Sequence, residues 1–103
     1  MKSILLIDDN AVQAATRQTI LKRAGYFVTA ALNPERALEH IRSKETAAAV
    51  HLVITDHFMP GMNGADFVRA LRTTHPVLPV LVISGLDEVE SEYAGLGVTF
   101  RLK

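Results

Sequence analysis

The segment HLVITD at residues 51–56 runs directly into HFMPGMNG at residues 57–64. Four of its first five residues are apolar or β-branched, which is typical of a buried strand, and the proline and glycines of the second segment stop that pattern. The predicted strand therefore ends on the carboxylate of Asp56. In an open α/β sheet, ligands bind just beyond the carboxyl ends of the strands, so Asp56 is a candidate for the working group of the protein.

The composition indicates one small globular domain, which we expect to span residues 1–103, with 49% hydrophobic residues to form a core. Eleven basic and eleven acidic residues cancel, so no overall charge attracts nucleic acid or an anionic membrane, and we expect no direct binding to either. The absence of cysteine excludes disulfides and thiolate metal sites. No apolar run approaches the ~20 residues of a membrane span, which favours a cytoplasmic protein.

Strand and helix patterns alternate along the rest of the chain. Continuous apolar or β-branched runs predict strands at residues 3–7, 26–30, 51–56, 80–84 and 98–102. Asparagines that can cap a helix precede predicted helices from about Ala11 to Ala24, from Pro34 and from Gly64. A further segment, residues 87–94, is long enough for only about two helical turns. Five strands alternating with helices predict a doubly wound α/β domain with a parallel sheet.

Polar residues follow the predicted strands where they end. Asp8 and Asp9 follow the first strand, Asp56 ends the third, Ser84 ends the fourth, and Lys103 follows the fifth. The carboxyl ends of parallel strands meet at one edge of the sheet, so we expect these side chains to share one crevice.

Three carboxylates in one crevice repel one another unless a cation lies among them. Asp8, Asp9 and Asp56 supply hard oxygen ligands, and no histidine or cysteine accompanies them in this cluster. Such a donor set suits Mg²⁺, which keeps several waters and is completed by a phosphate oxygen, better than zinc or a calcium cage.

Together these residues resemble the receiver domains of two-component response regulators, the CheY-like fold. The resemblance covers the whole chain and rests on four motifs in order. They are Asp8-Asp9 after the first strand, Ile54-Thr55-Asp56 with the following Met59-Pro60-Gly61 and Gly64, Ser84-Gly85 after the fourth strand, and Lys103 three residues after Phe100. The resemblance implies a flavodoxin-like sheet of strand order 2-1-3-4-5.

The resemblance also implies a function and a role for each site residue. Asp56 would accept a phosphoryl group from a phosphohistidine on a sensor histidine kinase or histidine phosphotransfer protein. Asp8, Asp9 and Asp56, with the backbone carbonyl of Phe58, would hold Mg²⁺. Ser84 would bind the phosphoryl group, and Lys103 would pair with it. Phe100 matches the aromatic residue that takes part in the conformational switch of the family. The domain would thus be a phosphorelay switch rather than an enzyme, and phosphorylation would change the surface around strands four and five.

The chain departs from the resemblance in two places. Only residues 86–97 separate the fourth and fifth strands, so the fourth helix is expected to be short, and no fifth helix follows Lys103 in this chain. Without a fifth helix, apolar side chains of residues 80–83 and 98–102 would meet water on one face of the sheet. We therefore expect self-association, as a homodimer, through that face.

Three alternative functions can be compared with the phosphorelay switch by the sequence features that each would need. An aspartyl-phosphate phosphatase wants a second acid two residues after Asp56, where this chain has Phe58. A nucleotide-binding module lacks its glycine-rich loop, because the glycines of residues 95–97 precede a strand. A phosphate-independent docking module stays open and would use the fold only as a surface. His57 and His75 are expected to be surface residues without a function.

Overall fold

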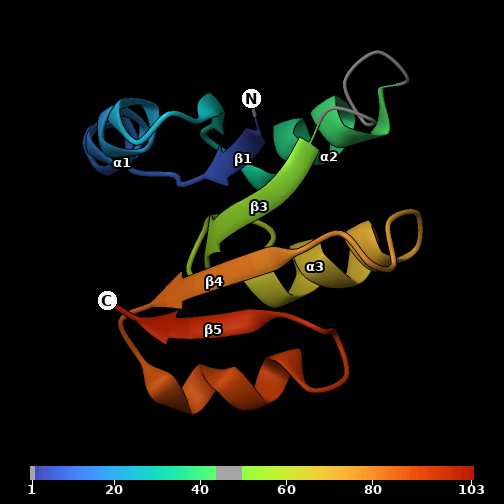
Figure 1. The fold of residues 1–103 in the computed structure, drawn as a ribbon. Helices are drawn as coiled ribbons and strands as arrows, with labels where there is room; N and C mark the ends of the chain where they lie inside the picture. Colours follow the sequence, from blue (N-terminus) through green and yellow to red (C-terminus); the bar gives the residue numbers. More distant parts are fainter. Residues whose placement is uncertain (1, 44–49) are drawn as a thin grey trace.

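The computed structural model describes residues 2–43 and 50–103. Five parallel strands form one sheet in the order β2-β1-β3-β4-β5, as the sequence predicts for the flavodoxin-like fold (Figure 1). In chain order the elements are β1 (Ser3–Ile7), α1 (Ala11–Arg23), β2 (Phe27–Ala31), α2 (Pro34–Arg42), β3 (Val50–Asp56), α3 (Gly64–Arg72), β4 (Val80–Ser84), the 3-10 helix η2 (Asp87–Tyr93) and β5 (Thr99–Leu102). The arrowheads of β1, β3, β4 and β5 point to the same side in Figure 1, which is the edge that carries the candidate site.

Local capping chemistry explains where the helices begin. The side chains of Asn10, Asn33 and Asn63 each accept a hydrogen bond from the backbone N–H three residues later, which satisfies one free donor of each first turn. After α1, Gly25 adopts a φ of 99°, the left-handed conformation that lets the chain turn back toward β2. β2 begins and ends one residue later than predicted.

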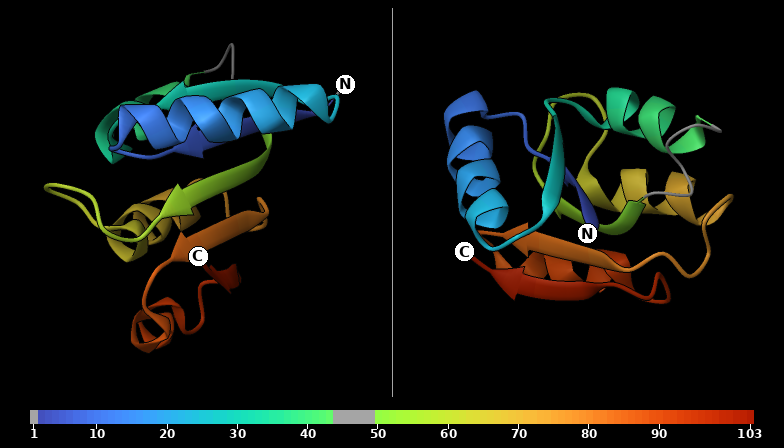
Figure 2. Two further views of the ribbon diagram at one scale, coloured as in Figure 1. Left: turned by 90° about the vertical axis from the view of Figure 1, so that its left-hand side faces the viewer. Right: turned by 45° about the horizontal axis from the view of Figure 1, so that its top comes forward.

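The two faces of the sheet are covered differently. Leu5, Val53 and Val82 belong to a large core that includes Phe67 and Leu71 of α3 and also residues of α2. The opposite face forms a smaller core of Ile4, Leu6, Val28 and Ile54 beneath α1. Figure 2 (right) shows α1 on one side of the strands and α2 and α3 on the other. This is the doubly wound arrangement expected from right-handed crossovers.

On the α1 side of the sheet, the side chains of β5 differ from those predicted. Leu81 and Ile83 lie on the α1 side of the sheet and are only partly buried, as predicted. Their neighbours in β5 are Thr99 and Arg101, because Leu81 pairs with Thr99 and Ile83 with Arg101. The prediction of an apolar outer face was therefore wrong for β5, since the alternation of side chains turns Phe100 toward the large core.

The segment between β4 and β5 is short, as predicted, and forms a 3-10 helix. Its buried anchors are Val89 and Tyr93. On the opposite edge of the sheet, Arg72 donates four hydrogen bonds of 2.7–3.1 Å to backbone carbonyls. Those carbonyls belong to His75, Leu78, Leu96 and Gly97, so Arg72 joins the loop before β4 to the loop before β5. Within the described ranges, no helix is long and apolar enough to cross a membrane.

Candidate functional site

The ends of β1 and β3, which are adjacent strands, bring three carboxylates together. Asp8, Asp9 and Asp56 each offer an oxygen, and these oxygens lie within 4.8 Å of one another. Asp8 is fully buried, Asp56 is 4% exposed and Asp9 is exposed. The cluster that the sequence predicted therefore forms, with two of its three carboxylates removed from water.

Two cations from opposite ends of the chain neutralise part of this charge. Lys103 places its Nζ 3.2 Å from Oδ1 of Asp56, as expected from its position after β5. Arg17 places a single nitrogen, Nη1, 3.1 Å from Oδ2 of Asp8 and 3.2 Å from Oδ1 of Asp56. Arg17 was not predicted as a site residue; it lies one helical turn beyond Ala14, the buried residue of α1. A charged residue on the sheet-facing stripe of a helix was the available signal.

Burial makes ionisation of Asp8 costly. Removal of its carboxyl from water raises its pKa from 3.8 to about 6, while the hydrogen bond from the Asn10 N–H opposes the rise. The neighbouring carboxylate of Asp56 contributes to this rise, and Arg17 opposes it. A cation beside Asp8 therefore favours its ionised form.

The donor set fits a hard divalent cation. Asp8, Asp9 and Asp56 supply carboxylate oxygens from two adjacent strand ends, and burial raises the pKa of Asp8, so a nearby cation would stabilise its charged form. Mg²⁺ accepts two or three such oxygens and keeps waters in its other positions. Phe58, the expected donor of a backbone carbonyl, lies two residues after Asp56 in an exposed turn.

Ser84 lies at the end of the strand next to the acid cluster, whereas Phe100 lies away from the cluster. Ser84 is buried at the end of β4, one residue beyond Ile83, which pairs with Asp56. Its Oγ accepts a hydrogen bond from the Leu86 N–H at 3.2 Å. Phe100 lies outside the cluster and packs against Tyr93 of η2, with ring centroids 6.0 Å apart. The expected switch aromatic thus contacts the segment between β4 and β5.

His57 is buried, which contradicts the expectation of a surface residue. Its ring is 3% exposed, and Nδ1 lies 2.7 Å from the Tyr93 hydroxyl, while Nε2 lies 3.4 Å from Oε2 of Glu92. Burial raises the pKa of Tyr93, with a smaller contribution from Glu92, so its hydroxyl keeps the proton that it can donate to Nδ1. Gly64 permits this contact, because a Cβ there would meet the hydroxyl. His75, by contrast, is half-buried in the loop after α3.

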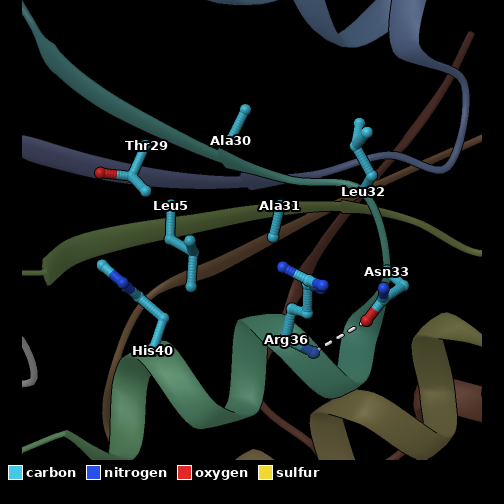
Figure 3. Close-up of a pocket in the computed structure, with 8 residues that line it drawn as sticks. All are labelled: Leu5, Thr29, Ala30, Ala31, Leu32, Asn33, Arg36 and His40. Atoms are coloured by element: carbon cyan, nitrogen blue, oxygen red, sulfur yellow. Dashed lines mark hydrogen bonds between the residues drawn. The ribbon is translucent and has the colours of Figure 1, made fainter.

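A separate hollow of about 540 Å³ lies between β2 and α2 (Figure 3). Arg36 and His40 project from α2 toward the strands, and Leu5 and Ala31 line the strand side. None of the expected site residues lines this hollow, so it is distinct from the acid cluster.

Comparisons with known proteins identify the family. Residues 4–99 match the family model of the response regulator receiver domain. The probable transcriptional regulatory protein TcrX of Mycobacterium tuberculosis is 32% identical over 94 residues, which are 91% of this chain and 38% of that protein. The chain spans well under half the length of the curated relatives that it matches.

Solved structures give the same result. Vibrio cholerae chemotaxis protein CheY4 has a TM-score of 0.88 at 28% identity, covering all of this chain and 87% of that one. The response regulator TrrA of Thermotoga maritima, in complex with Mg²⁺-BeF, has a TM-score of 0.86 at 25% identity and the same coverage. The acid cluster, the strand order and these matches lead to one assignment: the chain belongs to the response regulator receiver domain family.

Proposed function

We propose that residues 1–103 form one receiver domain in which Asp56 accepts a phosphoryl group from a phosphohistidine of a histidine kinase or histidine phosphotransfer protein. Receiver domains of this family receive phosphate from histidine kinases. The observation that supports Asp56 most strongly is its environment. It is buried at the end of β3, beside two further carboxylates, and has Lys103 3.2 Å from Oδ1.

The proposed reaction transfers one phosphoryl group. A carboxylate oxygen of Asp56 attacks phosphorus, the bond between phosphorus and the imidazole nitrogen breaks, and the electron pair leaves with the imidazole. Lys103, which already contacts Asp56, compensates the negative charge that the carboxylate gains as an acyl phosphate. The Ser84 hydroxyl accepts from Leu86 and retains its own proton to donate to a phosphoryl oxygen.

Asp8, Asp9 and Asp56, with the Phe58 carbonyl, are the residues that would hold Mg²⁺. When bound, the ion supplies charge neutralisation for the attacking carboxylate and the phosphoryl oxygens. Receiver domains bind Mg²⁺ at an acidic pocket of this kind, and the similar TrrA structure contains Mg²⁺-BeF. The domain positions and neutralises its reactants and acts as a signalling switch.

The surface that responds would include η2 and β5. Phosphorylation replaces the single negative charge of Asp56 with a group that carries roughly −1.5 to −2, next to His57, the residue after Asp56. His57 contacts Tyr93, and Tyr93 packs against Phe100, so these three rings join the phosphoacceptor strand to β5. This chain of contacts supports an output surface around β4 and β5.

Intact mass spectrometry tests the proposal. Incubation with Mg²⁺ and acetyl phosphate should add one phosphate to the wild-type chain, and Asp56→Asn should remain unlabelled while folded. Asp66→Asn is a matched control, because Asp66 is an exposed acid in the first turn of α3 and its replacement should leave labelling unchanged. A wild-type chain that gains no phosphate would favour the remaining alternative, a docking module that works without phosphate.

Self-association through the α1 face is a second proposal. A groove of about 240 Å³ lies on this face. Its lining consists of Arg17 and the apolar side chains of Leu6, Ile20, Leu21, Ile54, Leu81 and Ile83. Ile20 is 61% exposed at its rim. Sedimentation velocity at high protein concentration should detect a dimer that Ile20→Glu disrupts and Val12→Glu preserves, because Val12 is also exposed on α1 but does not line the groove. A monomeric wild-type chain would refute this proposal.

A further inference from the structure

We infer that Arg17 is a built-in counter-ion of the acid cluster that competes with Mg²⁺ and so sets the magnesium concentration at which the domain can be phosphorylated. The inference deepens the proposed function and rests on it for its biological meaning. Its physical content, a competition between two cations for the same carboxylates, can be measured without any phosphodonor.

The contacts of Arg17 provide the first argument. Its Nη1 lies 3.1 Å from Asp8 and 3.2 Å from Asp56, so one nitrogen takes an oxygen from each of two expected metal ligands. The other oxygen of Asp8 already accepts the Asn10 N–H at 2.9 Å. A cation that binds Oδ2 of Asp8 must therefore share or replace the contact that Arg17 makes.

The charge of the cluster provides the second argument. With its three carboxylates ionised, the cluster carries two net negative charges when Lys103 is counted, and only one when Arg17 is counted as well. The attraction for a divalent ion grows with that net charge, and repulsion from a nearby guanidinium opposes the ion directly. Arg17 therefore lowers magnesium affinity in two ways, by occupying oxygens and by repelling the ion.

The way Arg17 is held makes the competition reversible. Within residues 2–43 and 50–103, Nη1 is the only guanidinium nitrogen of Arg17 that makes a hydrogen bond, so the ion pair lacks the two-pronged geometry that fixes an arginine firmly. The side chain is 19% exposed and borders the apolar groove on the α1 face. The exposed part of the side chain gives the guanidinium a path toward water when a stronger cation arrives.

Isothermal titration with Mg²⁺ alone tests the inference in the intact chain. Arg17→Gln and Arg17→Met remove the charge, and the methionine variant keeps an apolar stem against the groove. Both should bind Mg²⁺ on the order of tenfold more tightly than the wild type. Arg23→Gln is the matched control, because it removes one positive charge from the exposed end of the same helix and should leave affinity within about twofold.

A second measurement uses the wild-type chain, so it does not depend on the folding of a variant. In a ¹⁵N NMR titration, Mg²⁺ should shift the guanidinium signal of Arg17 and leave that of Arg23 in place. Unchanged or weaker Mg²⁺ binding by both neutral variants, an Arg17 signal that does not shift at saturating Mg²⁺, or no Mg²⁺ binding by any chain would each overturn the inference.

Acetyl phosphate labelling is a separate experiment. If labelling fails but affinity rises, only the proposed function fails. If labelling succeeds and affinity is unchanged, only the role of Arg17 fails.

Discussion

Replacement of Asp8 by asparagine should stabilise the domain in the absence of metal. The side chain is fully buried, and burial raises its pKa from 3.8 to about 6. Asparagine has nearly the same shape and can still accept the Asn10 N–H through its side-chain oxygen, which lies 2.9 Å away in Asp8. Asp8→Asn therefore removes a buried charge with little other change.

The pKa difference sets both the sign and the size of the effect. A carboxyl group whose pKa is raised in the folded state binds its proton more tightly there than in the unfolded chain, so stability falls as the pH rises from 3.8 to about 6. At about 1.4 kcal/mol for each pKa unit, the cost of ionised Asp8 reaches about 3 kcal/mol above pH 6. This is a net cost, because the pKa already includes the attraction of Arg17.

Urea unfolding in EDTA, followed by circular dichroism between pH 3.5 and 8, measures this cost. Asp8→Asn should match the wild type near pH 3.5 and exceed it by about 3 kcal/mol at pH 8, which corresponds to a Tm higher by roughly 10–20 °C. Asp9→Asn removes the same charge from an exposed side chain and should gain less than a third as much. A constant difference between Asp8→Asn and the wild type at every pH would refute the reasoning, because the gain must appear as Asp8 ionises.

Three further substitutions, two beside the site and one at the opposite edge of the sheet, are each measured by urea unfolding at pH 7. Tyr93→Phe should cost about 1–3 kcal/mol, because it leaves Nδ1 of the buried His57 without the hydroxyl 2.7 Å away, and a loss below 0.5 kcal/mol would mean that water replaces it. Gly64→Ala should cost at least 1–3 kcal/mol, since the new Cβ would lie 2.6 Å from the carbonyl oxygen of Asp56, and a neutral result would show that α3 shifts freely. Arg72→Lys should cost on the order of 3 kcal/mol through lost hydrogen bonds to loop carbonyls, whereas Arg69→Lys, on an exposed arginine of the same helix, should change stability little.

The parts of the fold that the sequence predicted depend on neighbouring residues. Apolar runs located all five strands, and asparagine caps located the starts of the three α-helices, because both signals act within a few residues. The meeting of Asp8 with Asp56 was also predictable, since parallel strands end at one edge of the sheet.

The missed features depend on contacts between distant residues. His57 meets Tyr93 thirty-six positions away, and its sequence neighbours Asp56 and Phe58 give no sign that its ring is buried. Arg17 reaches Asp56 across thirty-nine positions, and its direction depends on how α1 crosses the sheet. The outer face of β5 was misjudged because a strand of four residues carries too few side chains to fix its alternation from sequence alone.

The 3-10 geometry of η2 makes this segment the one expected to unfold locally while the sheet stays folded. Runs of this helix longer than three or four residues are uncommon because their hydrogen bonds are poorly aligned, yet η2 extends over seven. Among the side chains of η2 that the structure describes, two are buried against the domain, Val89 and Tyr93. Segments with few buried contacts open at a small fraction of the global unfolding free energy. The amides of η2 should therefore exchange with solvent deuterium well before those of β3, and loss of the Tyr93 anchor should speed that exchange without unfolding the sheet. Such a segment would respond to a charge change beside His57 through the fraction of time it spends detached, rather than through the shift of a rigid helix.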